Sequence, residues 1–90
     1  MRLDSFLSDV RLIKRRTQAK KACEAGLVLL DGREAKPGKE IQAGQIITIN
    51  FARRVLEVQI LEIPLRSVRK EEAQNLYRVV REEKKKEELF

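Results

Sequence analysis

The feature that most restricts the fold of this chain is a change of hydrophobic spacing at Gly26. Before that residue, apolar side chains recur at the spacing of one helical face, so residues 3–10 are predicted to form a short helix. After it, residues 27–30 form a continuous apolar run, which indicates a strand. The helical face consists of Leu3, Phe6, Leu7 and Val10. Helices followed by strands predict an α+β protein.

A second helix is predicted from Thr17, whose hydroxyl group suits the N-cap position. Gly26 lies where that helix would end and where a residue with positive φ is favoured. Small side chains would let the second helix pack closely on the first. These small residues are Ala19, Ala22, Cys23 and Ala25.

Turn residues divide the rest of the chain into short strands. Asp31-Gly32 predicts a tight hairpin turn, and Pro37-Gly38 predicts a second turn. Residues 45–51 are rich in β-branched side chains, and residues 56–61 alternate apolar and polar side chains, so both are predicted as strands. The expected core consists of Leu3, Phe6, Leu7, Leu12, Ala19, Ala22, Leu27, Val28, Ile47 and Ile49.

The pattern becomes helical again from about Arg69. The expected stripe consists of Ala73, Leu76, Tyr77 and Val80. Because Pro64 separates this region from the preceding strand, we predict a domain over residues 1–63 and a helical extension over residues 64–90. That stripe also leaves open a second function, in which the last helix docks on a protein partner.

The net charge is concentrated in the first part of the chain. Residues 1–54 contain twelve basic and six acidic residues, whereas residues 55–90 contain eight of each, so the whole net charge of +6 lies in the first part. Such a one-sided positive field attracts polyanions. Membrane headgroups would respond to it as well, so charge alone does not identify the partner. No run approaches the roughly 18 apolar residues of a membrane span.

The residue types that are missing argue against an enzyme. Without histidine and with a single cysteine, Cys23, the chain has neither a zinc ligand set nor a Ser/His or Cys/His pair. Its four glycines are too widely spaced for a phosphate-binding loop. We therefore expect a non-catalytic protein without a cofactor. A lone thiol and the lack of a secretory signal favour the cytoplasm.

The strongest local signal is the segment from Arg11 to Lys21, in which six of eleven residues are basic and none is acidic. It spans the junction of the two predicted helices. Arginines next to a helix N-terminus form a good phosphate site, because guanidinium groups and free N–H groups both bind oxygen. The predicted phosphate-binding residues are Arg11, Lys14, Arg15, Arg16, Lys20 and Lys21.

Two other interpretations of this segment remain. It could be a solvated charged face, or the second helix could recognise DNA in a helix-turn-helix arrangement. Gln18 is the only obvious base-reading residue on that helix, so a protein that recognises RNA structure and phosphates fits better. With only 4% aromatic residues, recognition of single strands by stacking is not expected.

These residues resemble the S4 RNA-binding domain. The similarity runs through Arg2-Leu3-Asp4, Phe6-Leu7, Arg15-Arg16-Thr17-Gln18-Ala19, Gly26-Leu27-Val28, Asp31-Gly32, Pro37-Gly38 and Ala43-Gly44-Gln45-Ile46-Ile47. It implies the S4 (alpha-L) fold, in which two packed helices lie on a small, mostly antiparallel sheet, here followed by a C-terminal helix. Asp4 is expected to be a cap or a salt-bridge partner of an arginine rather than a direct RNA contact, because phosphates repel a carboxylate.

A closer resemblance covers nearly the whole chain. Residues 11–17 and 70–73 are similar to the stand-alone S4 proteins of bacterial ribosome-associated quality control, the RqcP family. This resemblance implies binding to 23S rRNA of a 50S subunit blocked by peptidyl-tRNA, support of alanine tailing, and RNA contacts by Arg2, Arg15 and Arg16. A monomer is expected, with a tRNA-recruiting quality-control factor as a possible neighbour. The alternative is a general large-subunit assembly or recycling factor related to the heat-shock S4 protein. A third hypothesis, an RNA-modifying enzyme, is disfavoured because nothing in this sequence provides a catalytic domain.

Overall fold

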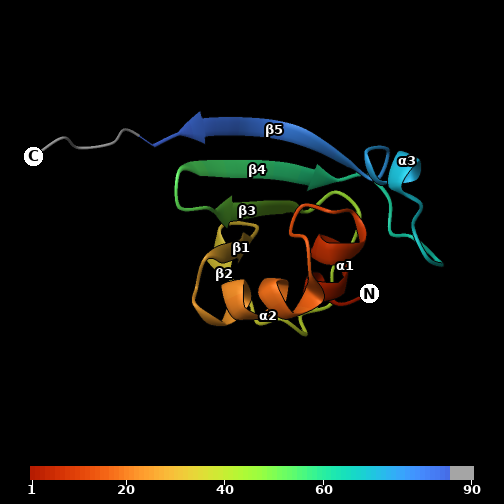
Figure 1. The fold of residues 1–90 in the computed structure, drawn as a ribbon, viewed down its shortest axis with the longest axis horizontal. Helices are drawn as coiled ribbons and strands as arrows, with labels where there is room; N and C mark the ends of the chain where they lie inside the picture. The colour runs from red at the N-terminus through yellow and green to blue at the C-terminus, as the bar shows by residue number, and fades with distance from the viewer. Residues whose placement is uncertain (86–90) are drawn as a thin grey trace, which may run out of the picture.

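The structure, a computed structural model, describes residues 1–85 as helices packed against one five-stranded antiparallel sheet (Figure 1). The α+β class predicted from the sequence is confirmed. Along the chain the elements are α1 (Leu3–Asp9), α2 (Arg16–Glu24), β1 (Val28–Leu30), β2 (Arg33–Glu34), β3 (Ile46–Asn50), β4 (Arg54–Ile60), α3 (Lys70–Ala73) and β5 (Tyr77–Lys84). The strand order is β2-β1-β3-β4-β5. No helix within residues 1–85 is long and apolar enough to cross a membrane.

The core forms between the two N-terminal helices and one face of the sheet. α1 buries Leu3, Phe6 and Leu7, while the small residues Ala19 and Cys23 of α2 allow the helices to approach closely. From the sheet, alternate residues of three strands complete the core because successive side chains of a strand point to opposite faces. These residues are Val28, Leu30, Ile47, Ile49, Leu56, Val58 and Ile60.

Most of the predicted core is buried, with one error. Leu12 and Ala22 are only partly buried, although both pack against the core. Leu27 is 39% exposed, so its assignment to the core was wrong. Because Val28 and Leu30 point inward, the strand alternation turns Leu27 to the other side.

The start of α2, inside the basic segment, differs from the prediction. The predicted N-cap at Thr17 is wrong, because α2 begins at Arg16 with Arg15 as N-cap, and no side chain caps it. After α1, Arg11 adopts the left-handed conformation with φ of 63°. At the other end of α2, Gly26 has φ of 76°, as predicted, and a Cβ there would lie 2.7 Å from Glu34 Oε1.

The predicted hairpin turn at Asp31-Gly32 is confirmed. Both residues have positive φ, and they join β1 to β2 with Leu30 opposite Arg33. The Asp31 carboxylate also accepts a hydrogen bond from the Ile46 N–H at 2.9 Å, which ties this turn to the start of β3. The hairpin is therefore fixed beside the sheet rather than projecting from it.

The prediction of a long C-terminal helix is wrong. α3 is a single turn, and Tyr77–Lys84 forms strand β5, which pairs with β4 from Ile60 to Arg54. Two facts explain the error: Tyr77, Val79 and Val80 favour strands, and β4 offers an edge that needs hydrogen-bonding partners. Of the expected stripe, Ala73 and Leu76 are buried, but Val80 is 48% exposed. The extension is thus not helical as a whole, while a boundary between residues 63 and 64 stays a prediction.

Candidate nucleic-acid interface

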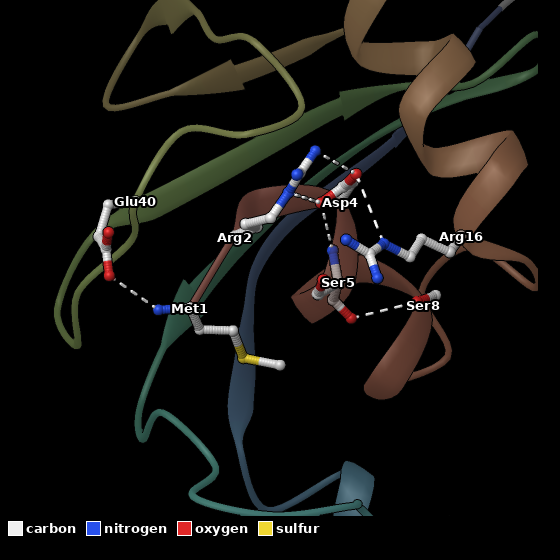
Figure 2. Close-up of polar contacts among 7 residues, drawn as sticks. All are labelled: Met1, Arg2, Asp4, Ser5, Ser8, Arg16 and Glu40. Carbon is white, nitrogen blue, oxygen red and sulfur yellow. Dashed lines mark hydrogen bonds and ion pairs between the residues drawn. The ribbon is translucent and has the colours of Figure 1, made fainter.

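The centre of the basic surface is one buried carboxylate that holds two arginines (Figure 2). Asp4 is 1% exposed. Its Oδ1 accepts hydrogen bonds from Arg2 Nε at 3.1 Å and from the Ser5 N–H at 2.8 Å, and its Oδ2 accepts one from Arg2 Nη2 at 3.1 Å. Arg16 Nε lies 3.6 Å from the same Oδ2. Asp4 is therefore a salt-bridge partner of arginines, as favoured from the sequence.

The chain brings these three residues together through the starts of two helices. Arg2 is the N-cap residue of α1, and Arg16 is the first residue of α2. Their side chains remain 51% and 56% exposed although they share a buried partner. Two guanidinium groups are thus held in position while part of each faces solvent. Such groups are suited to bind phosphate oxygens.

The segment between β2 and β3 forms a wall beside this arginine pair. The Leu3 N–H donates a hydrogen bond to the Lys39 carbonyl at 2.9 Å, and the Asp4 N–H donates one to the Pro37 carbonyl at 3.1 Å. The amino group of Met1 lies 3.0 Å from Glu40 Oε1. A Cβ at Gly38 would lie 3.6 Å from the Arg2 guanidinium, an ordinary van der Waals contact, so this turn lies directly beside Arg2. The segment is therefore fixed to the start of α1.

Between α2 and this wall lies an open groove of about 790 Å³. Arg2 and Lys20, both predicted from the sequence, contribute to its lining. Three further cations were missed by the sequence analysis, namely Arg33, Lys36 and Lys39. The sequence does place the two lysines on either side of the predicted turn at Pro37-Gly38. Only the fold, however, shows that this turn faces α2. The acidic residues of the lining are Glu24, Asp31 and Glu34.

The other predicted residues lie on the surface around the helix junction. Each of them is exposed, and none belongs to the lining of the groove. They are Arg11, Lys14, Arg15, Gln18 and Lys21. The structure therefore joins Arg2 and Arg16 through Asp4 and places Lys20 in the groove, while these five extend the surface along the junction and α2. Because no side chain caps α2, the N–H groups of its first turn are open to a bound anion.

Cys23, the cysteine buried on α2, lies next to this surface. Burial, with a smaller contribution from the Asp4 carboxylate, raises the pKa of the Cys23 thiol to about 11, so the thiol stays protonated and unreactive near neutral pH. Within residues 1–85, no group of three histidine, cysteine or acidic side chains is placed to hold a metal ion. What the surface offers is positive charge and hydrogen-bond donors.

Comparison with known proteins identifies the family of this chain. The S4 domain family model matches residues 1–47. An RQC P-site tRNA stabilizing factor of Halalkalibacterium halodurans is 46% identical, with 92% of this chain and 93% of the relative covered. The factor of the same name from Bacillus subtilis is 40% identical, with 93% and 96% covered.

Solved structures show the same fold in related proteins. The trimeric structure of Vibrio cholerae heat shock protein 15 matches with a TM-score of 0.80 and 33% identity, covering 89% of this chain and 81% of that one. A heat shock protein 15 homologue of Aeromonas salmonicida is 35% identical, but only 48% of its length is covered. Because the quality-control relatives match over almost their whole length, the chain belongs to the S4-domain family of RQC P-site tRNA stabilizing factors.

Proposed function

We propose that this protein is a non-catalytic RNA-binding factor of ribosome-associated quality control that docks on the large ribosomal subunit. Its relatives are named for stabilizing P-site tRNA, which supports tRNA and ribosome binding by this chain. In the finer form of the proposal, the surface contacts 23S rRNA and peptidyl-tRNA, and binding keeps the tRNA in place while alanine tails are added to a stalled chain.

The observation that carries the proposal is the arginine pair on Asp4. Ordering a long side chain on binding costs about 0.5–1.5 kcal/mol, and Arg2 and Arg16 are already ordered by the buried carboxylate. The groove beside them adds Lys20, Arg33, Lys36 and Lys39. A phosphate backbone that follows the groove would therefore meet preorganised donors first and flexible lysines next.

Binding measured over a series of salt concentrations tests this surface. We expect Arg16→Ala and Arg2→Ala each to weaken binding to large subunits that carry peptidyl-tRNA, and each to lower the slope of log affinity against log salt by about one. Arg66→Ala is the matched control, because Arg66 is exposed and lies in the segment before α3. Equal slopes for the wild-type protein and all three variants would remove this surface from the proposal.

A second candidate is a general large-subunit assembly or recycling factor of the heat-shock S4 type. The TM-score of 0.80 to heat shock protein 15 favours it. Cells that lack the protein separate the two candidates when alanine tails on stalled chains are measured. Loss of the tails, with restoration by the wild-type protein but not by Arg16→Ala, supports the quality-control role. Normal tails with a defect in free large subunits support the alternative.

A further inference from the structure

The end of the sheet away from α1 carries a second group of cations. Figure 1 shows that the β3–β4 turn and the C-terminal end of β5 lie together there, whereas α1 and the N-terminus lie toward the opposite end. The cations at this end, called the end cluster below, are Arg53, Arg54, Lys84 and Lys85, and all are exposed.

The end cluster contains one cation–cation pair in register between β4 and β5, and two further cations joined by a backbone hydrogen bond. Arg54 lies directly opposite Lys84, and the Lys85 N–H donates a hydrogen bond to the Arg53 carbonyl at 3.0 Å. Like charges directly opposite each other destabilise a sheet. The same pair of strands also has opposite charges in register, since Glu57 lies opposite Arg81 and the two form an ion pair of 3.4 Å. Two cations lie opposite each other only at this end of the strand pair. This arrangement favours a role of these cations in binding rather than in stabilising the sheet.

The local contacts fix part of this positive charge in place. The Arg54 guanidinium lies 4.8 Å from the centroid of the Phe51 ring and bonds to Glu82. The neighbouring Glu83 bonds to Arg81. Among residues 1–85, the two carboxylates next to this end are thus engaged by arginines. Lys84 and Lys85 add two exposed positive charges there, beside an arginine stacked on an aromatic ring.

We propose that the end cluster binds a second stretch of RNA phosphate backbone, separate from the surface around Arg2 and Arg16. This inference rests on the proposed function, because the blocked large subunit is taken as the source of the RNA. The lysines supply point charges for phosphates, and Arg54 supplies a planar donor. A factor that holds tRNA on a subunit needs contacts on two bodies. The arginines at the starts of α1 and α2 and the end cluster on the sheet offer two such contacts.

The double variant Lys84→Gln/Lys85→Gln tests the end cluster in the full-length protein. Its matched control is Arg66→Gln/Lys70→Gln, which removes the same charge from two exposed residues near α3. The probe is a bacterial large subunit that carries peptidyl-tRNA, with binding measured from about 50 to 200 mM salt. Two lost phosphate contacts reduce the slope by about 1.4–1.8, so the wild-type protein should lose roughly 7- to 12-fold more affinity over this range than the double variant.

The outcomes separate this inference from the proposed function. If the wild-type protein binds and the lysine variant has a lower slope than the control, the end cluster binds RNA. If both variants keep the wild-type slope, the inference is overturned while the proposed function stands. Failure of the wild-type protein to bind the subunit overturns both. Thermal unfolding provides the check on folding, since removing like-charge repulsion should leave the midpoint unchanged or higher.

Discussion

Replacing Asp4 by asparagine tests whether the buried carboxylate orders the arginines for RNA. The amide keeps the shape of the side chain but loses the charge that holds Arg2 and Arg16 at 3.1 and 3.6 Å. Two opposing effects then act on affinity. The arginines must be ordered again when RNA binds, and a negative charge near the phosphates is gone.

The magnitudes decide which effect wins. Immobilising two long side chains costs about 1–3 kcal/mol in total, which corresponds to roughly 5- to 150-fold in affinity. The carboxylate is buried, and a phosphate bridged to it by a guanidinium would lie about 7 Å away, so their repulsion is about 2.4 kcal/mol at an effective dielectric constant of about 20 and about 1 kcal/mol after screening by physiological salt. We therefore expect Asp4→Asn to weaken RNA binding although the protein becomes more positive. The lost charge-assisted bonds should also lower the unfolding free energy by about 1–3 kcal/mol.

The assay is binding to tRNA-blocked large subunits, below the unfolding midpoint of the variant. Glu71→Gln is the control, because it removes the same charge from an exposed carboxylate in α3, outside this surface. Unaltered affinity for Glu71→Gln with at least fivefold weaker binding for Asp4→Asn supports the argument. Tighter binding by Asp4→Asn would refute it, because it would show that charge outweighs the ordering of the arginines.

Three further changes have defined outcomes. Arg11→Gly should stabilise the protein by about 0.5–1 kcal/mol, seen as a rise of a few degrees in the unfolding midpoint, because φ of 63° suits glycine; it should also weaken RNA binding. Phe6→Ala should cost about 3–5 kcal/mol in chemical denaturation, because Phe6 is fully buried. Cys23 should resist alkylation at pH 8 until the protein unfolds, and stability should fall as pH rises from about 9 to about 11, because the unfolded thiol ionises first. A reactive Cys23 in the native protein, or stability that rises over this range, would contradict the burial argument.

The sequence predicted the elements whose signals are local. Helical spacing predicted α1. Gly26 predicted a helix end and Asp31-Gly32 predicted a turn, and the backbone has positive φ at all three residues. The strand pattern also located β3 and most of β4. In each case a short stretch of chain contains both the signal and the structure that it specifies.

The larger errors arise where partners distant in the sequence decide the structure. Tyr77–Lys84 has a spacing compatible with a helix, yet it forms β5 because β4 offers an edge for pairing. Similarly, Arg33, Lys36 and Lys39 became part of the groove only because the segment between β2 and β3 folds back onto the start of α1. The basic segment was found from charge alone, but its link through Asp4 to Arg2 needed the fold.

The central claim is that this surface recognises a large subunit blocked by tRNA. Cosedimentation with free 50S subunits, 50S subunits that carry peptidyl-tRNA, and intact 70S ribosomes tests it most directly when repeated over several salt concentrations. We predict preferential binding to the 50S–peptidyl-tRNA complex, which persists at salt concentrations that release the protein from the other two. Equal and equally salt-sensitive binding to all three would contradict the claim and leave only a general affinity for RNA.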